Sequence, residues 1–353
     1  MGLPRTTPPR LPDHITRRLR LPLIAAPMFS VSGVDLVVAA CRNGVIGAFP
    51  TVNARSTAVL DQWLGEINAR LFAAPEEAAP PCPNLIMRSP RMADDLACLV
   101  QHRVELVITS VGSPAPAVAA LHAIGCLVLA DVATLAHARK AIAAGADGLV
   151  LLTAGAGGQT GWLNPLAFVR ALRAEYDGPL VLAGGISDGV ALRAAQVLGC
   201  DLAYMGTRFI ATRESLADDA YRQMLVEASI DDVLLTRAFT GLPTNMLLPA
   251  IRRAGLDPAR LDEQVSPASA AQLFGGGTHH DQDQAHAQTQ AQVDAQAEAD
   301  HTSAGSHNRP PPDTPKRWRD IWSAGHSVSG VRALQSVDAL VAQVEQEFHH
   351  APG

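Results

Sequence analysis

The chain has 353 residues, more than one simple domain usually needs but suitable for a β/α barrel with insertions. A composition of 48% hydrophobic and 18% charged residues is that of a globular protein, and it excludes collagen, wholesale disorder and a small disulfide-built scaffold. The 28 Lys and Arg against 34 Asp and Glu give a net charge of −6, and no basic face is evident. This balance argues against a nucleic-acid or anionic-membrane partner.

The cysteines and the amino-terminal stretch both bear on the compartment. The five cysteines are scattered and never form a CxxC pair, which favours small buried thiols in a reducing compartment. The amino-terminal stretch is basic, but prolines interrupt it before a long apolar core forms, so it is a poor secretory signal. No run of about 18 apolar residues is present to span a bilayer. We therefore expect a soluble cytoplasmic protein.

Short aliphatic runs recur along the chain, and helical patterns fill the intervals between them. Most runs last four or five residues without polar alternation, as in parallel strands that are covered on both faces. The predicted strands are residues 23–26, 45–48, 84–87, 106–110, 126–130, 148–152, 179–183 and 202–205. The predicted helices are residues 34–42, 56–71, 93–99, 114–123, 134–143, 165–175 and 188–198. Eight strands alternating with seven helices predict a TIM barrel, (β/α)8, rather than an open sheet of five or six strands.

The pattern changes beyond the eighth predicted strand. Residues 1–213 are predicted to form the barrel core, and residues 214–274 a small, mostly helical region on the substrate side that begins with a helix at 214–229. Residues 275–315 are rich in Gln, His, Asp and Pro and nearly free of large aliphatic side chains, which predicts a disordered insertion. Residues 316–353 are predicted to return to the barrel and to end in an amphipathic helix at 336–348.

Glycines cluster just beyond the last two predicted strands. The loops after strands seven and eight of a barrel commonly bind a phosphate. Gly184, Gly185 and Gly206 would let backbone N–H groups approach an anion closely, and Thr207 adds a hydroxyl donor. A tight turn alone explains one such glycine pair. Two glycine turns at the two positions where barrels bind phosphate favour a phosphate site.

Other motifs that carry chemistry are missing or incomplete. The sequence has no GxxxxGK[ST] Walker loop and no GxSxG turn. The glycines of residues 154–161 do not match GxGxxG, and no acidic residue follows at the spacing that a Rossmann fold requires. Five histidines lie in the insertion, where weak metal capture is the alternative to a solvated tract: His279, His280, His286, His301 and His307. We predict no metal site.

Six segments occur in the order that is typical of one enzyme family. They are PLIAAPM (22–28), NLIM (84–87), TSVGSP (109–114), AGAGGQTG (154–161), VLAGGISDG (181–189) and YMGTRFIATRES (204–215). In these segments the chain resembles nitronate monooxygenases, formerly called 2-nitropropane dioxygenases. That group of FMN-dependent barrels also includes NAD(P)H:quinone reductases and enoyl reductases. The resemblance spans roughly residues 22–245 and resumes at 318–330.

The resemblance implies an FMN that lies across the carboxyl-terminal mouth of the barrel. The backbone of Ala26, Pro27 and Met28 would follow the edge of the isoalloxazine ring, and Asn84 would hydrogen-bond the ring or the ribityl chain. Gly158 and Asp131 are also predicted to contact the cofactor. The residues expected to hold the 5′-phosphate are Ala183, Gly184, Gly185, Met205, Gly206 and Thr207.

The chain departs from the family pattern at two positions. Gln159 stands where these enzymes typically carry a His that serves as catalytic base or donor. Glutamine cannot act as a general base, although it can donate a hydrogen bond to a nitro, carbonyl or thioester oxygen. We take Gln159 as the catalytic residue, and expect that abstraction of a proton from a neutral nitroalkane needs another group. Asp131 stands where many relatives have a Lys that contacts the flavin, and the sequence does not say whether Arg88, Lys140 or another cation compensates.

Three further residues are predicted to lie on the substrate side. His326 belongs to the segment 322–330, which resembles a family loop that folds back toward the flavin, although a plain surface histidine is the alternative. Thr240 and Asn245 also suit this side, although both equally suit turn capping. The predicted function is oxidation of alkyl nitronates with O2. The alternatives are an NAD(P)H-dependent quinone or enoyl-thioester reductase and, in another class, a non-redox phosphate-binding lyase or isomerase. A homodimer is left open.

Overall fold

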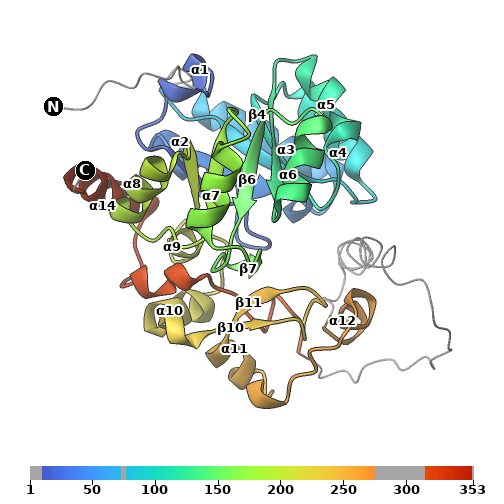
Figure 1. The fold of residues 1–353 in the computed structure, drawn as a ribbon, viewed down its shortest axis with the longest axis vertical. Helices are drawn as coiled ribbons and strands as arrows, with labels where there is room; N and C mark the ends of the chain where they lie inside the picture. Colours follow the sequence, from blue (N-terminus) through green and yellow to red (C-terminus); the bar gives the residue numbers. More distant parts are fainter. Residues whose placement is uncertain (1–9, 73–76, 275–314, 352–353) are drawn as a thin grey trace.

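The computed structural model describes residues 10–72, 77–274 and 315–351, and its centre is a closed barrel of eight strands (Figure 1). All neighbouring strands in the barrel are parallel, which confirms the predicted (β/α)8 fold. In barrel order the strands are β1 (Leu23–Ala25), β2 (Ile46–Pro50), β3 (Pro81–Ile86), β4 (Leu106–Ser110), β5 (Leu127–Val132), β6 (Gly148–Leu152), β8 (Leu180–Ala183) and β9 (Leu202–Met205).

Aliphatic side chains fill the inside of the barrel and the layer between its strands and helices. One buried cluster joins inward-facing residues of opposite strands, among them Ile24, Ile108, Val150 and Val181. Residues that alternate with these along the strands pack outward against the helices. Both faces of each strand are thus buried, which explains why the strands read as unbroken apolar runs.

Seven helices follow the strands near the predicted positions. Side-chain caps mark where several of them begin: Ser56, Thr134, Asn164 and Asp188 each accept a hydrogen bond from the first turn of the helix that follows. The helices are α2 (Val34–Arg42), α3 (Thr57–Leu71), α4 (Met92–Gln101), α5 (Ala115–His122), α6 (Leu135–Ala143), α7 (Pro165–Arg173) and α8 (Gly189–Leu198). A short α1 (Asp13–Thr16) precedes the barrel, and α9 (Thr207–Ile210) follows β9.

The helix α14 (Val337–His350) completes the outer ring of the barrel. It contacts α8 and α2, so it stands between the last and the first of the large barrel helices. A Cβ atom at Gly189 would lie 2.1 Å from the backbone N of Phe348, so only glycine allows α8 and α14 to approach this closely. Arg20, in the loop before β1, forms an ion pair with Glu345 of α14.

A second region covers the carboxyl-terminal mouth of the barrel and contains a sheet that the sequence did not predict (Figure 1). This antiparallel sheet has the order β10 (Val233–Thr236), β11 (Thr244–Leu247) and β7 (Gly158–Gln159). Its helices are α10 (Asp219–Glu227), α11 (Leu248–Arg253) and α12 (Pro267–Phe274). The helix expected at 214–229 is shorter because Asp218 caps its first turn. The predicted insertion lies outside the described residues, apart from residue 315.

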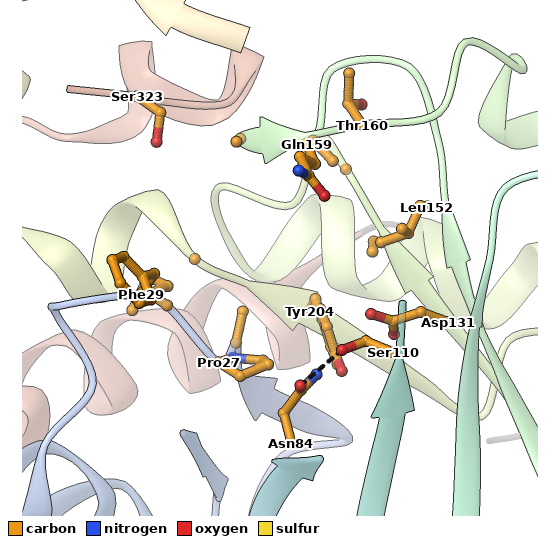
Figure 2. A pocket seen from close by; sticks show the side chains of 18 of the residues that line it. Pro27, Phe29, Asn84, Ser110, Asp131, Leu152, Gln159, Thr160, Tyr204 and Ser323 are labelled. Atoms are coloured by element: carbon orange, nitrogen blue, oxygen red, sulfur yellow. Dashed lines mark hydrogen bonds between the residues drawn. The ribbon is translucent and has the colours of Figure 1, made fainter. Parts of the chain in front are cut away.

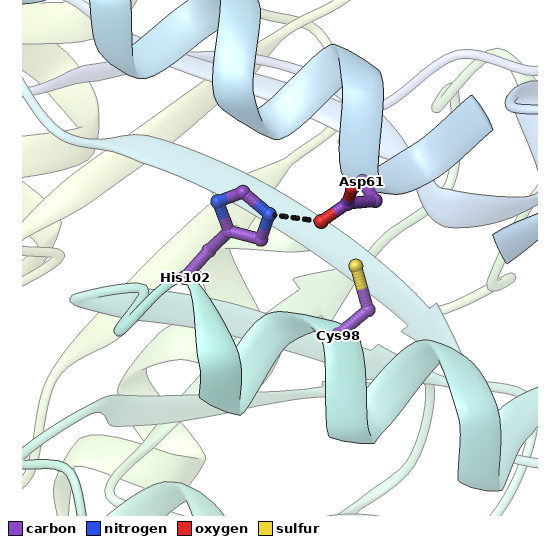
Figure 3. Close-up of side chains that lie close together, drawn as sticks. All are labelled: Asp61, Cys98 and His102. Atoms are coloured by element: carbon purple, nitrogen blue, oxygen red, sulfur yellow. Dashed lines mark hydrogen bonds and ion pairs between the residues drawn. The ribbon is translucent and has the colours of Figure 1, made fainter. Parts of the chain in front are cut away.

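Polar contacts on the outside of the barrel tie neighbouring helices together. His102, at the end of α4, contacts Asp61 of α3 at 2.7 Å, next to the buried thiol of Cys98 (Figure 3). Burial raises the pKa of the Cys98 thiol to about 11, so it stays protonated at neutral pH. All five cysteines are buried and free, as predicted. Among residues 10–72, 77–274 and 315–351, no helix combines the length and the apolar character needed to cross a bilayer.

Candidate active site

A cavity of about 660 Å³ opens at the carboxyl ends of the barrel strands. The end of every barrel strand contributes to its lining, and barrel enzymes bind their substrates at this face. Its opposite wall comes from α10, the loop before β11 and residues 317–327, which contribute Tyr221, Thr240, Trp318 and Trp322. Ser323 belongs to the same wall (Figure 2). A space of this size suits a cofactor or small-molecule site.

Two glycines after β8 form one corner of the cavity. Gly184 and Gly185 have φ angles of +126° and +77°, in the region that L-residues rarely adopt. A Cβ atom at Gly184 would lie 2.6 Å from the Thr153 hydroxyl oxygen, whereas one at Gly185 would meet no atom within 4 Å. The backbone at Gly185 therefore borders open space, where a ligand can approach it closely.

The start of α9 completes this corner. The Thr207 hydroxyl accepts a hydrogen bond from the N–H of Gly325 at 3.1 Å, which leaves its own proton for donation. Arg208 is buried, and its guanidinium donates to the carbonyl of Ser187 at 2.9 Å, which braces the turn after Gly185. Gly206 has φ −103°, so a left-handed conformation is not what favours glycine there. Free N–H groups at a helix start, left-handed glycines and a hydroxyl make this corner suitable for an anion.

The glycine-rich loop after β6 is shaped by the carboxyl-terminal segment. A Cβ atom at Gly157 would lie 2.7 Å from the N of Gly325, and one at Gly155 would lie 2.8 Å from the His326 ring. The N–H of His326 donates to the carbonyl of Gly155 at 2.9 Å. Gly157 therefore lets two backbones pack directly against each other, and Gly155 leaves room for the His326 ring, a structural reason that the sequence alone did not reveal.

Gln159 is held over the cavity by the second region. It pairs with Thr244 of β11, and its side chain points from β7 toward the strand ends of the barrel (Figure 2). The buried Asn245 amide donates to the carbonyl of Ala156 at 2.7 Å, and the Thr160 hydroxyl donates to the carbonyl of Thr153 at 2.8 Å. Both bonds fix the loop that carries Gln159, and the side-chain amide of this residue faces the cavity as a hydrogen-bond donor.

The segment after β1 forms the wall beside Gly206. The Met28 N–H donates to the Ser32 hydroxyl at 3.0 Å, and the Asn53 amide donates to the Met28 carbonyl at 2.9 Å. These bonds hold the backbone of Ala26 and Pro27 along the cavity. The segment thus offers the cavity a largely apolar edge, because Ser32 and Asn53 engage the backbone polar groups of Met28.

The floor of the cavity is polar, although the barrel below it is not. Asn84, which is only 6% exposed, accepts a hydrogen bond from the Ser110 hydroxyl at 2.8 Å (Figure 2). This bond uses the amide oxygen and leaves the amide N–H groups as donors. Asp131 and Tyr204 share the floor, and Asp131 Oδ1 and the Tyr204 hydroxyl are buried without a hydrogen-bond partner among the described residues.

Burial changes the protonation chemistry of this floor. It raises the pKa of the Asp131 carboxyl from 3.8 to about 7. It also raises the pKa of the Tyr204 hydroxyl well above 10, and the nearby Asp131 adds to that shift. Asp131 as a whole keeps partial exposure through the cavity, so ligands and solvent can reach it. At neutral pH the floor therefore holds one group that exchanges a proton readily and one that remains an O–H donor.

Three cationic or potentially cationic residues at the rim were not among the predicted site residues. Arg88 follows β3, and His137 and Lys140 lie one turn apart on α6. None of the three forms an ion pair with a carboxylate of the described part of the chain, and all are exposed. No sequence motif marks His137 and Lys140. Their spacing of three residues, together with the helix start that Thr134 caps, is the one sequence signal that could have placed them on one helix face.

Most of the predicted site residues meet in this one cavity. Those that line it are Ala26, Pro27, Met28, Asn84, Asp131, Gly158, Gln159, Ala183, Gly184, Gly185, Gly206, Thr207 and Thr240. Met205, Asn245 and His326 do not line it. Met205 is fully buried behind Gly206, Asn245 positions the glycine-rich loop, and His326 is exposed beside Gly155. The Thr240 hydroxyl also lies 2.9 Å from the Leu242 carbonyl, in a turn.

Comparison with known proteins identifies the family of this chain. The sequence profile of the nitronate monooxygenase family matches residues 15–255. The chain belongs to the nitronate monooxygenase family. It is 31% identical to the nitronate monooxygenase of Pseudomonas aeruginosa over 67% of this chain and 82% of that protein. It is 29% identical to the enzyme of that name from Paraburkholderia phytofirmans, over 73% and 85% of the two chains. The protein is therefore an oxidoreductase of a flavin-dependent family, which excludes the non-redox lyase or isomerase.

The chain is also similar to proteins that carry other names. The chain is 28% identical, over 64% of its length and 62% of the relative, to a hydroxy-methyl-oxo-octahydroindene-carboxyl-CoA dehydrogenase of Mycobacterium tuberculosis. Among solved structures, nitroalkane oxidase from Streptomyces ansochromogenes superposes with a TM-score of 0.72 at 22% identity, covering 96% and 98% of the two chains. FabK from Thermotoga maritima superposes with a TM-score of 0.71 at 23% identity, covering 98% and 97%. These likenesses confirm the fold.

Proposed function

We propose that this protein is an FMN-dependent oxidoreductase that oxidises alkyl nitronates with O2. The observation that carries the proposal is that one cavity joins a corner suited to an anion, at Gly184, Gly185 and Thr207, to a hydrogen-bond donor, the Gln159 amide. The nitronate monooxygenases among its relatives support the same substrate class.

The residues of the cavity fit the cofactor. A 5′-phosphate would be held at the backbone of Gly185 and Gly206 and at the Thr207 hydroxyl, where an added Cβ at Gly185 would enter empty space. The ring would lie along the edge formed by Ala26 and Pro27, over a floor with unsatisfied polar atoms that call for hydrogen-bond partners. FMN, with one terminal phosphate, matches a single such corner better than a dinucleotide does.

The flavin supplies the electron-accepting ring. The residues of this chain bind and orient the substrate. The Gln159 amide donates a hydrogen bond to a nitro oxygen, and it cannot remove a proton from carbon. Arg88, His137 and Lys140 at the rim favour the entry of an anion, because no carboxylate of the described residues neutralises them. Both features suit a substrate that arrives as the nitronate anion.

Two measurements test the proposal. Chromatography of the flavin released by heating should identify FMN, and FAD or no flavin would contradict the cofactor assignment. Aerobic stopped-flow with propionate 3-nitronate and, separately, NADH should show oxidation of the nitronate and little reaction with NADH. Flavin reduction by NADH alone would overturn the assignment of substrate.

An NAD(P)H-dependent reductase of a quinone or an enoyl thioester is the second candidate. Gln159 favours it, because transfer of a hydride needs an oriented acceptor oxygen but no general base at this position. The carboxyl-CoA dehydrogenase among the relatives supports this candidate, because its name assigns it a CoA thioester as substrate. The NADH arm of the same stopped-flow experiment, followed by addition of quinone or enoyl thioester, separates the two candidates.

A further inference from the structure

A side-chain cluster on the outside of the barrel combines oxygen, sulfur and nitrogen donors. It consists of Asp61 on α3, Cys98 on α4 and His102 at the end of α4 (Figure 3). One carboxylate oxygen, the sulfur and one ring nitrogen all lie within 4.8 Å of one another, and no other such group of three occurs in the described part of the chain. None of the three residues lines the cavity, so the cluster is separate from the candidate active site.

Two neighbouring helices bring these residues together. Cys98 and His102 are one helical turn apart, at the spacing of four that places side chains on one face. Asp61 reaches them from α3, which packs against α4, and its Oδ1 lies 2.7 Å from His102 Nε2. Asp61 and His102 are 41 residues apart in the chain, which explains why the sequence, from which we predict no metal site, gives no sign of the cluster.

The spacing of the donor atoms suits a tetrahedral ion. Around Zn²⁺, nitrogen, oxygen and sulfur ligands lie about 3.4–3.6 Å apart. The sulfur is already within 4.8 Å of both partners, and the 2.7 Å between His102 and Asp61 would lengthen by about 0.7 Å as the ion replaces their hydrogen bond. The Asp61 side chain is 53% exposed, so an ion can enter from solvent and keep a water molecule as its fourth ligand.

The charges around the thiol favour a cation. Burial raises the pKa of the Cys98 thiol, and the carboxylates of Asp61 and Asp95 add to that shift. Asp95 is paired with Arg91 at 2.9 Å, so Asp61 is the carboxylate that remains for an ion. A thiol in these surroundings is a poor nucleophile, which argues against a redox or catalytic role. A divalent cation suits them, because it displaces the proton of a thiol that it coordinates and balances the charges of the thiolate and the carboxylate.

We propose that Asp61, Cys98 and His102 bind one Zn²⁺ ion, with water as the fourth ligand, and that the ion fastens α3 to α4. As the Zn–S bond forms, the thiol proton passes to solvent, and the neutral imidazole binds through Nε2. One nitrogen, one sulfur and one oxygen donor select against Mg²⁺ and Ca²⁺, which prefer oxygen ligands alone. The inference does not depend on the proposed function, because it concerns residues outside the cavity.

X-ray absorption at the zinc edge tests the site in the holoenzyme. The protein, freed of metal with EDTA and then given one equivalent of Zn²⁺, should show a sulfur neighbour about 2.3 Å from the ion. The five histidines of residues 275–315 can also capture zinc, but that segment contains no cysteine and cannot provide sulfur. Cys98→Ala and, separately, His102→Ala should lower zinc affinity about a hundredfold or more, since the outer partners of metal ligands alone contribute ten- to a hundredfold.

Two control variants each remove one feature of the cluster elsewhere in the barrel. Cys41→Ala deletes another buried, free thiol. His122→Ala breaks a pair of the same kind, in which His122 Nε2 lies 2.9 Å from Asp147 Oδ2 but no third ligand completes a group. Both variants should keep the sulfur neighbour and the zinc affinity of the wild type.

A sulfur neighbour that Cys98→Ala removes and Cys41→Ala preserves supports the inference. Zinc with only nitrogen and oxygen neighbours in the wild type overturns it, and this measurement does not depend on any variant folding. A sulfur neighbour that persists in Cys98→Ala overturns it as well, as does a wild type that binds no zinc at micromolar concentrations. If Cys98→Ala does not fold, the unchanged affinity of His102→Ala would contradict the site in its place.

Discussion

The cavity has two sides that are built in different ways. At the ends of β8 and β9, backbone makes the surface: Gly184, Gly185 and Gly206 offer N–H groups, and Arg208 braces the turn from behind. At the ends of β3, β4 and β5, side chains make the surface, in the polar floor and the cationic rim. A surface built of glycine backbone can bind any ligand that carries a phosphate. A surface built of side chains changes its chemistry when a single residue is substituted. Both departures from the family pattern, Gln159 and Asp131, lie outside the glycine corner.

The largest expected effect concerns the side-chain side of the cavity and appears as stability. The folded-state pKa of Asp131 lies above the ordinary value of 3.8, so its ionisation opposes folding as the pH rises from about 4 to about 7. Asp131→Asn removes this penalty. Relative to the wild type, the variant apoprotein should gain up to about 4 kcal/mol in unfolding free energy at alkaline pH, and nearly nothing below about pH 4.

Urea unfolding of the two apoproteins, measured across this pH range, checks the prediction. A difference in unfolding free energy that stays constant with pH would show that the Asp131 carboxyl titrates normally. The backbone-built corner has no titratable group that would produce such a trend.

The next effect concerns the glycine corner. Gly185→Val places a side chain in the open space beside the backbone donors and should remove one or two charge-assisted hydrogen bonds to the phosphate. Each bond is worth about 1.5–3 kcal/mol, or roughly ten- to a hundredfold in FMN affinity. Gly255→Val is the matched control, because Gly255 also has φ +77° and open space around it but does not line the cavity. Fluorescence titration of both apoproteins should show weak FMN binding only for Gly185→Val; equal affinities would place the phosphate elsewhere.

A smaller gain is expected from restoring the family histidine at position 159. Gln159→His should raise the ratio of nitroethane to nitronate rates by about tenfold, because a histidine held by the β7–β11 pairing can act as a base. Anaerobic stopped-flow, in which nitroethane or its preformed nitronate reduces the flavin of the holoenzyme, measures this ratio. If a variant that still binds FMN shows no gain, position 159 is not one from which a base reaches the α-proton.

The smallest effect concerns the rim. Lys140→Met should lower kcat/KM for an anionic nitronate about two- to fivefold and weaken its dependence on salt, as loss of one exposed steering charge does. Arg139→Met is the control, since Arg139 is the adjacent residue of α6 but pairs with Glu175 and does not line the cavity. Equal effects of the two variants would mean that only net charge matters.

The barrel and its glycine corner could be predicted because their signals are local. Strands buried on both faces are unbroken aliphatic runs, and the glycine turns follow them directly in the chain. The sheet that holds Gln159 could not be predicted, because β7 has only two residues and its partner β11 lies far away in sequence. The same holds for His137 and Lys140, which look like ordinary residues of a solvated helix until the fold brings them to the cavity that Arg88 also lines. Long-range pairing leaves little trace in a short stretch of sequence.

The position of α14 has a consequence for how the protein acquires its shape. Residues 337–350 fill the gap between α8 and α2, and the segment just before them lies against the glycine-rich loop. A ribosome must therefore synthesise all the strands, the second region and the insertion before the ring of helices can close. Until then the faces of α8 and α2 that α14 covers remain exposed. The loop at Gly155 and Gly157 is exposed as well. Such late contacts between sequence-distant segments slow folding, and a nascent chain at this stage is a natural client for chaperones.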